Sequence, residues 1–185
     1  MYDECIIDRD EGPRVPDLEK IKSLSPAFME NGTITAATSS PVSIGASAIL
    51  ITSRTYAEKN SIQIKATIKG RSIVGVDWRR MGMGPLPATE NVLKSLEMTM
   101  NDIDVIELNE AFSAQALYVI KEGGWDASKI NLNGGAIALG HPLGCSGARI
   151  ITTLLSVMEQ KNSRTGLATM CVGTGQGIAT ILERD

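Results

Sequence analysis

The sequence predicts an α/β fold, with a mixed, mostly parallel sheet of five strands, helices on its faces and a loop-rich segment before it. Residues 62–68 alternate apolar and polar side chains, which is typical of a half-buried strand. Beyond them, short apolar runs alternate with stretches of helical periodicity, as in parallel sheets. The last two apolar runs, 166–172 and 177–182, are separated by a Gly-rich loop, which predicts an antiparallel hairpin.

The composition indicates a globular, non-nucleic-acid-binding protein. Of the 185 residues, 43% are hydrophobic and 21% are charged, which suffices for a packed core. The net charge of −3 argues against a nucleic-acid partner. No apolar run is long enough to span a membrane. The three widely spaced cysteines do not form a disulfide pattern, so we expect free thiols and a cytoplasmic location.

The first third of the chain is expected to hold little regular structure. Residues 1–45 predict loops and one short helix, for which Asp17 is available as N-cap. Residues 32–41 are small and polar and form either a linker or a ligand-facing loop. An apolar run over 46–52 and a polar helix end over 54–60 follow.

The elements after residue 62 then follow from periodicity and turn residues. The first strand is expected to continue past a bulge at Gly70, and Thr89 is expected to cap the first helix. The others expected in order are a strand over 102–108, a helix over 109–122 ended by Gly123-Gly124, a short strand before Asn133, a helix after His141 and the final hairpin.

The only histidine, His141, lies in the Gly-rich stretch 131–147. Pro142 suits the first turn of a helix, and apolar residues recur at helical spacing as far as Met158. We therefore expect His141 at a helix N-terminus, whose dipole favours the neutral imidazole. The alternative is a Gly-rich turn with a capping histidine.

Three chemically capable residues lie at or after predicted strand ends, namely Asn109, His141 and Cys171. Ligands of such sheets bind beyond the carboxyl ends of the strands, so an amide, an imidazole and a thiol can converge there. Each has a structural alternative. Asn109 is a good N-cap for its own helix, and a lone cysteine ending an apolar strand is usually a small core residue.

Three motifs closely resemble the C-terminal signatures of thiolases: Asn109-Glu110-Ala111-Phe112, residues 133–149 and residues 171–177. The resemblance covers nearly the whole chain. Ser39-Ser40 and Thr174 look more like the degradative 3-ketoacyl-CoA thiolases of fatty-acid β-oxidation than the biosynthetic type. It implies the C-terminal half of the thiolase fold. Its parts would be 1–45, a remnant of the loop domain; 46–61, the end of the N-terminal half-domain; and 62–185, the C-terminal half-domain.

The resemblance also implies catalytic roles. His141 would activate a nucleophilic cysteine and, with a water held by Asn109, form an oxyanion hole for the thioester carbonyl. Cys171 would be the acid/base that moves protons at the α-carbon or at the thiol of coenzyme A. The backbone N–H of Gly173 would serve a second oxyanion hole, where a side chain would crowd the acyl group.

The substrate implied by the resemblance is acyl-CoA or CoA, with no metal and no permanently bound cofactor. Ser40 matches a CoA-contacting position, and Arg14 matches another if a one-residue gap is allowed. Phe28 and Phe112 match apolar positions that line the pantetheine tunnel.

The nucleophile of thiolases is a cysteine of the N-terminal half, and no segment here matches its surroundings. Cys5 resembles the approach to the loop domain, and Cys145 is interpreted as packing. We therefore expect the C-terminal part of a 3-ketoacyl-CoA thiolase, an acyltransferase that is inactive without its missing half. The complete protein is expected to be a homo-oligomer. The alternatives are a non-catalytic acyl-CoA-binding or assembly module and a ketosynthase, which would require two histidines.

Overall fold

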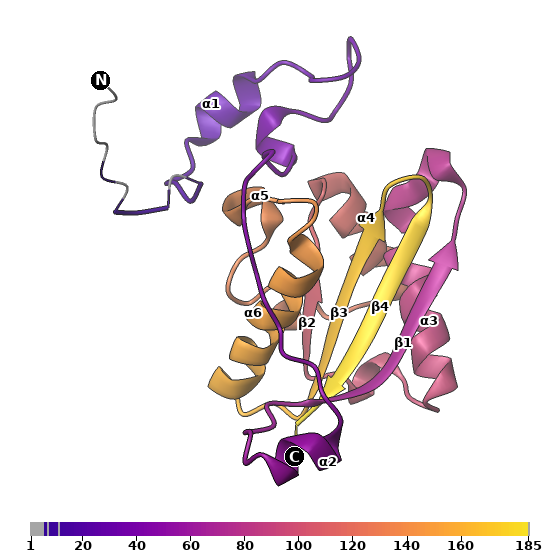
Figure 1. Cartoon of the computed structure of the whole chain (residues 1–185). Helices are drawn as coiled ribbons and strands as arrows, with labels where there is room; N and C mark the ends of the chain where they lie inside the picture. The colour runs from indigo at the N-terminus through magenta and orange to yellow at the C-terminus, as the bar shows by residue number, and fades with distance from the viewer. Residues whose placement is uncertain (1–5, 7, 11, 185) are drawn as a thin grey trace.

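The computed structural model describes residues 6, 8–10 and 12–184, and its core is one sheet (Figure 1). The order of the strands across the sheet is β1-β4-β3-β2. Their bounds are Thr67–Gly75 for β1, Val105–Leu108 for β2, Thr165–Val172 for β3 and Gln176–Glu183 for β4. The C-terminal hairpin thus occupies the centre of the sheet.

The sheet of the described residues has four strands and is mixed, so the prediction of five mostly parallel strands is wrong in both respects. Only β2 and β3 pair in parallel, whereas β4 is antiparallel to both β3 and β1. The hairpin is confirmed, and so is the bulge, because the register shifts between Ile68 and Gly70. Alternating side chains identify a strand but not the direction of its neighbour, which explains the error.

The predicted short strand before Asn133 is reduced to a single bridge between Ile130 and Ile106. Asn131 then adopts a positive φ of 49°. Its side chain takes over the pairing, since Leu108 N–H donates to Asn131 Oδ1 at 2.9 Å and Asn131 Nδ2 donates to Leu108 O at 2.8 Å. An amide side chain therefore satisfies the edge of β2 where a fifth strand was expected.

The first strand begins at Thr67 and not at residue 62. Thr67 pairs with Glu183, the last residue of β4, so residues 62–66 pair with no strand in the described part of the chain. They still alternate between half-buried and exposed side chains, which is the pattern that the sequence displays.

Helices cover both faces of the sheet (Figure 1). Helices α3 (Pro85–Ser95) and α4 (Ser113–Gly123) cover one face, and α6 (Ser146–Gln160) covers the other. The first interface is built around Val92, Leu93, Ile106, Leu108, Val119, Leu167 and Ile181. The second is built around Val105, Ile150, Leu154, Val157, Met158, Ala168 and Leu182.

The helix starts differ from those predicted. Helix α3 begins at Pro85 after Gly84, four residues before Thr89, because proline at the first position presets the helical φ. Helix α4 begins at Ser113 and ends at Gly123, and its C-cap Gly124 has a left-handed φ of 61°, which agrees with the predicted Gly-Gly stop. The short helices are α5 (Ala136–Leu139), η2 (Trp78–Met83), η3 (Met100–Asp102) and η4 (Ala127–Lys129).

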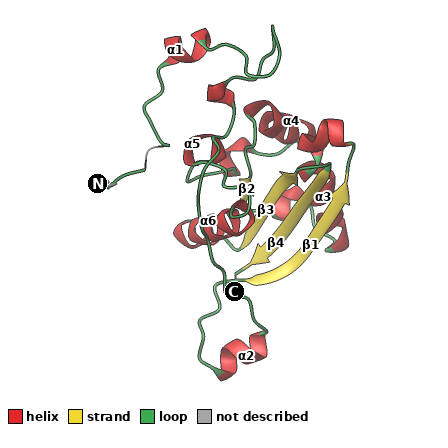
Figure 2. Cartoon of the chain, turned by 45° about the horizontal axis from the view of Figure 1, so that its top comes forward, coloured by secondary structure: helices red, strands yellow, loops and turns green. Residues whose placement is uncertain are grey.

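The segment before the sheet is dominated by loops (Figure 2). Its helices are α1 (Leu18–Ser23), η1 (Ala36–Thr38) and α2 (Arg54–Lys59). The predicted cap is confirmed, because Asp17 accepts from Lys20 N–H at 3.1 Å. An extended stretch then runs beside α6, where Ser47 Oγ lies 3.1 Å from Thr152 Oγ1. Within the described residues, no helix has the length and apolar character needed to cross a membrane.

Candidate active site

Asn109 lies buried at the carboxyl end of β2. Its N–H extends the parallel ladder by donating to Thr169 O at 3.0 Å, and the residue is 1% exposed. The N-cap of α4 is Phe112, without a side-chain hydrogen bond, so the alternative that Asn109 caps this helix is wrong. The carboxamide instead faces His141 and Arg149.

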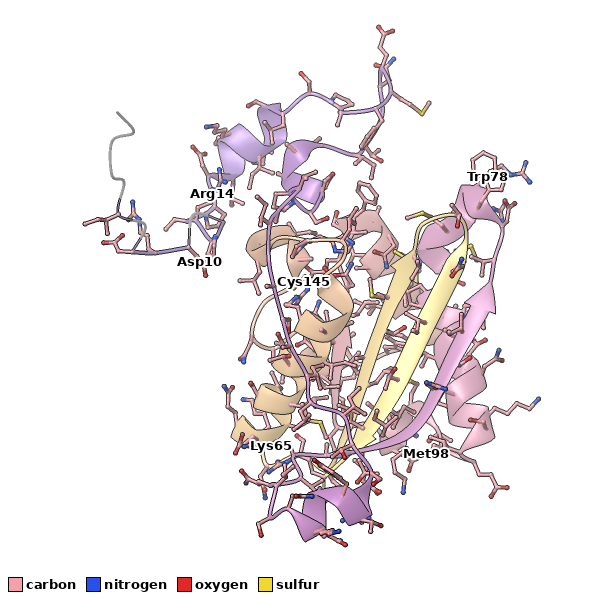
Figure 3. The ribbon with its side chains drawn as sticks, viewed as in Figure 1. Asp10, Arg14, Lys65, Trp78, Met98 and Cys145 are labelled. Carbon is pink, nitrogen blue, oxygen red and sulfur yellow. The ribbon has the colours of Figure 1, made fainter. Side chains whose placement is uncertain are left out.

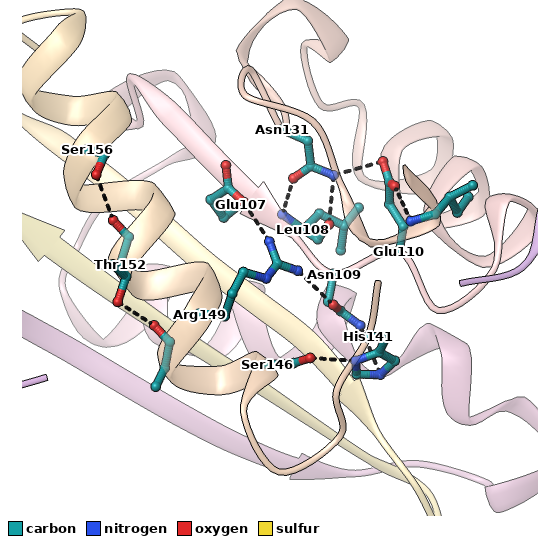
Figure 4. Close-up of polar contacts among 12 residues, drawn as sticks. Glu107, Leu108, Asn109, Glu110, Asn131, His141, Ser146, Arg149, Thr152 and Ser156 are labelled. Atoms are coloured by element: carbon teal, nitrogen blue, oxygen red, sulfur yellow. Dashed lines mark hydrogen bonds and ion pairs between the residues drawn. The ribbon is translucent and has the colours of Figure 1, made fainter. Parts of the chain in front are cut away.

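His141 is held at both ring nitrogens (Figure 4). Asn109 Nδ2 lies 3.3 Å from His141 Nε2, and Ser146 Oγ lies 2.6 Å from His141 Nδ1. The Ser146 hydroxyl donates to Pro142 O at 3.0 Å, so its oxygen accepts the hydrogen of Nδ1. The imidazole is therefore neutral and protonated on Nδ1, with the lone pair of Nε2 turned toward Asn109.

The neutral imidazole agrees with the prediction, but its physical cause is different. Burial lowers the pKa of His141, and the charge of Arg149 lowers that pKa further. Helix α6 begins at Ser146, so His141 is not in its first turn and Pro142 belongs to the preceding turn. The helix reaches the imidazole through the Ser146 hydroxyl.

The depressed pKa of His141 predicts a pH-dependent stability. NMR of the single imidazole should give a lower pKa for the folded chain than for the chain in urea, where we expect about 6.5. Because the unfolded chain then binds the proton more readily, the contribution of His141 to the free energy of unfolding is complete above the unfolded pKa. It is lost as the pH falls through the folded pKa.

Urea unfolding of the chain and of a His141→Gln variant at several pH values isolates this contribution. The acid-induced loss of stability should be smaller in the variant. A folded pKa equal to or above that of the unfolded chain would contradict the prediction.

The Glu110 side chain, just after β2, accepts hydrogen bonds from the segment that precedes His141. Its Oε1 accepts from Asn131 Nδ2 at 3.0 Å and its Oε2 accepts from Ile137 N–H at 3.2 Å. A Cβ at Gly135 would overlap this carboxylate, so a larger residue there would displace Glu110 from its present position. Sequence reasoning gave Glu110 no role, although an acid directly after Asn109 in a signature motif was the available signal.

A buried ion pair lies behind Asn109. Arg149 Nη2 is 3.4 Å from Asn109 Oδ1, and Arg149 Nη1 is 3.7 Å from Glu107 Oε2. Glu107 is 1% exposed, and burial raises its pKa to about 7 against the lowering effect of the Arg149 charge. Sequence reasoning did not single out this pair, because it joins β2 to α6 across 42 positions of the chain.

Cys171 lies near the end of β3, at the same edge of the sheet as Asn109. The parallel register pairs Leu108 with Thr169, two residues before Cys171. Cys171 is 3% exposed, and burial raises the pKa of its thiol, so the thiol keeps its proton at neutral pH. Within the described residues, no hydrogen bond joins its side chain to Asn109 or His141. Both its predicted role and the core alternative stay predictions.

Gly173 opens the turn between β3 and β4. Thr174 and Gly175 in this turn have φ values of 69° and 92°. A Cβ at Gly173 would meet nothing within 4 Å, so the packing of the described chain does not itself require glycine there. Its N–H donates to no acceptor in the part of the chain that the structure describes, and is thus available to a ligand oxygen.

Three of the four proposed CoA-contacting residues gather before α4. The N–H and the hydroxyl of Ser40 both point to Ala111 O, at 3.0 and 3.1 Å. Ser39 forms a bridge with Phe112, and the rings of Phe112 and Phe28 pack edge to face with centroids 6.1 Å apart. The loop over 32–41 is therefore anchored to the domain that carries Asn109.

Arg14 lies elsewhere, on the N-terminal segment apart from the strands (Figure 3). It is exposed, and its Nε lies 3.4 Å from Gly12 O. Cys145 is a buried free thiol at the N-cap of α6, which fits its interpretation as packing. Cys5 lies outside the described residues. No group of three His, Cys, Asp or Glu side chains in the described ranges is placed to hold a metal.

The sequence matches the models of two domains of one protein family. Residues 62–184 match "Thiolase, C-terminal domain" and residues 2–55 match "Thiolase, N-terminal domain". The chain therefore belongs to the thiolase family.

Within this family, the chain is similar to 3-ketoacyl-CoA thiolases. The chain is 53% identical to that of Shewanella loihica over 188 aligned positions, covering 100% of this chain and 47% of the relative. It is 56% identical to that of Vibrio vulnificus, covering 90% of this chain and 44% of the relative. The chain thus spans about half the length of these proteins, which are enzymes.

Solved structures agree on the fold. The Bacillus anthracis acetyl-CoA acetyltransferase superposes with a TM-score of 0.92 and 40% identity, covering 95% of this chain and 45% of that chain. The human mitochondrial 3-ketoacyl-CoA thiolase in complex with CoA superposes with a TM-score of 0.87 and 36% identity, with the same coverage.

Proposed function

We propose that this chain is the C-terminal part of a 3-ketoacyl-CoA thiolase, which in the complete protein transfers an acyl group between 3-oxoacyl-CoA and CoA in fatty-acid β-oxidation. The observation that carries the proposal is the contact of Asn109 with a neutral His141 whose Nε2 carries no proton and faces the Asn109 amide. Similarity to 3-ketoacyl-CoA thiolases over 90% or more of the chain supports it.

In the first half-reaction, His141 Nε2 takes the proton of a cysteine thiol supplied by the N-terminal half. The thiolate attacks the 3-oxo carbonyl, and the bond between the α-carbon and that carbonyl breaks to leave an acyl-cysteine. The Nε2–H that His141 has gained and a water held by Asn109 stabilise the oxyanion of the departing acetyl-CoA enolate. Ser146 keeps the ring oriented throughout.

Cys171 completes the proton transfers. Its thiol gives a proton to the α-carbon of the departing acetyl-CoA, a role that its raised pKa supports. The resulting thiolate takes the proton of an incoming CoA thiol, whose sulfur attacks the acyl-cysteine and releases acyl-CoA. The departing cysteine sulfur recovers its proton from His141 Nε2. The free N–H of Gly173 would hold the oxyanion of this second step.

Ser40, Phe28 and Phe112 form the CoA-contacting surface in this proposal, with Arg14 a more distant member. Their packing before α4 also favours the alternative of a non-catalytic acyl-CoA-binding module. Calorimetry of the 185-residue chain with CoA tests for CoA binding, and an activity assay with the other half supplied distinguishes the two. Heat of binding without turnover is expected from either a module or a partial site, but only a partial site gains activity when the other half is supplied.

The same proposal divides the chain into 1–45, 46–61 and 62–185. It also includes the missing N-terminal half as a partner and a homo-oligomeric state for the complete protein. The two family matches, which end at residue 55 and begin at residue 62, support a boundary between them. The buried free thiols Cys145 and Cys171 support a cytoplasmic location.

A hybrid protein tests the proposed function. In it, this chain replaces the matching C-terminal region of the Shewanella loihica relative. We expect the hybrid to cleave a 3-oxoacyl-CoA to acetyl-CoA in the presence of CoA, and the 185-residue chain alone to be inactive. A folded but inactive hybrid would contradict the proposal, as would turnover by the chain alone.

The proposed missing half also predicts self-association of the isolated chain. The extended stretch beside α6 exposes Leu50 and Ile51 at 75% and 71%, and both residues line an apolar groove of about 510 Å³. Such apolar surface is normally covered. Sedimentation velocity should show association that rises with concentration and weakens in the Leu50→Ser, Ile51→Ser double variant.

Val15→Ser is the matched control, because Val15 is 93% exposed and lies away from this groove. It should leave the association unchanged. A monomer at every concentration would refute the prediction.

A further inference from the structure

The orientation of the Asn109 carboxamide decides whether His141 Nε2 faces a hydrogen-bond donor or an acceptor. The nitrogen and oxygen of a carboxamide occupy nearly equivalent positions, and rotating the group by half a turn exchanges a donor for an acceptor. With Nδ2 toward His141 the amide donates to the Nε2 lone pair at 3.3 Å. With Oδ1 toward His141 it would instead favour a ring protonated on Nε2. Because Asn109 is 1% exposed, bulk water does not set this choice.

Arg149 supplies the group that does. Its guanidinium can only donate, so Nη2 at 3.4 Å from the carboxamide selects the orientation in which Oδ1 faces Arg149. Arg149 and Ser146 are three positions apart on α6 and therefore share a face of the helix. One helix face thus holds the Asn109–His141 pair at both ends (Figure 4).

Glu107 explains how Arg149 is held in this place. It precedes Asn109 by two residues on β2, so both side chains leave the same face of the strand. The other residues of this strand are apolar, and Glu107 is 1% exposed. Its Oε1 has no hydrogen-bond partner within the described chain, and Oε2 faces Arg149 Nη1 at 3.7 Å. A carboxyl group in such a strand serves no evident packing purpose.

We propose that Arg149, held by Glu107, is a positioning residue that fixes the Asn109 carboxamide with its nitrogen toward His141. The catalytic value of this arrangement rests on the proposed function, because it keeps Nε2 unprotonated, as a base for a thiol proton must be, and leaves the second Nδ2 hydrogen for the oxyanion water. The positioning itself can be measured on the isolated chain.

Nitrogen NMR of the single histidine reads the ring tautomer directly. At pH 8 we expect the Nδ1–H form to dominate in the 185-residue chain. Arg149→Met should let the carboxamide rotate and shift the tautomer ratio toward the Nε2–H form by about tenfold, the effect of losing one hydrogen bond to a charged group.

Arg149→Met leaves Glu107 without its ion partner and can unfold the chain. The double variant Glu107→Leu, Arg149→Met removes both members and should show the same shift. Arg184→Met is the matched control, because Arg184 donates to Met158 O, outside this network, and should leave the tautomer unchanged.

An unchanged tautomer ratio in a folded Arg149 variant would overturn the proposal, and so would an equal shift in the Arg184 control. An inactive hybrid thiolase with the expected tautomer shift would count against the proposed function alone. The two failures are therefore distinguishable.

Discussion

His141→Ala should lower the turnover of the hybrid thiolase by about 10³-fold, which is the usual loss when a general base is removed. The variant leaves no group to accept the proton of the nucleophilic cysteine, and it removes one donor of the proposed oxyanion site. Initial rates of acetyl-CoA release from a 3-oxoacyl-CoA, measured by chromatography, check the prediction. Activity within tenfold of the unmodified hybrid would contradict the assigned role.

The two buried thiols provide a matched comparison in the same assay. Cys171→Ala should cost about 10²-fold or more, because it removes the proposed proton carrier. Cys145→Ala should change the rate by no more than a few-fold, because Cys145 packs at the start of α6. Similar losses in the two variants would contradict the distinct role assigned to Cys171.

Gly177→Ala should destabilise the chain by about 3 kcal/mol, the upper part of the usual range for overpacking. Gly177 lies in β4, and a Cβ there would overlap the backbone carbonyl of Gly84, the residue before α3. Backbone atoms cannot move aside as a side chain can, so β4 and α3 would have to separate. Urea unfolding followed by circular dichroism measures the change.

Gly75→Ala is the control for this effect. Gly75 ends β1, the strand next to β4, and a Cβ there would meet nothing within 4 Å. We expect its stability to change by less than about 0.5 kcal/mol. If the two variants unfold at the same urea concentration, the close approach of β4 and α3 is not a determinant of stability.

The sequence predicted most elements but not how they pair. The Gly-rich turn after Val172 and the bulge at Gly70 were visible because they depend on local residues, and both are confirmed. No local signal excluded the fifth strand. It does not form because the side chain of Asn131 takes the hydrogen bonds at the edge of β2. The start of β1 likewise depends on where β4 ends.

In the candidate site, too, the sequence indicated the features that depend on local residues but not those that depend on packing. Asn109, His141 and Cys171 were found because amide, imidazole and thiol groups lie at or after strand ends. Arg149 and Glu107 read as an ordinary helix residue and an acid within an apolar strand. Their function emerges only when α6 packs on β2 and brings them to the back of Asn109.

Mass spectrometry of the hybrid thiolase after brief exposure to a 3-oxoacyl-CoA shows which cysteine carries the acyl group. We expect an acyl adduct on a cysteine of the N-terminal half, unmodified Cys145 and Cys171, and acetyl-CoA released in equal amount. An acyl adduct on Cys145 or Cys171, or a folded hybrid that forms no adduct, would contradict this expectation.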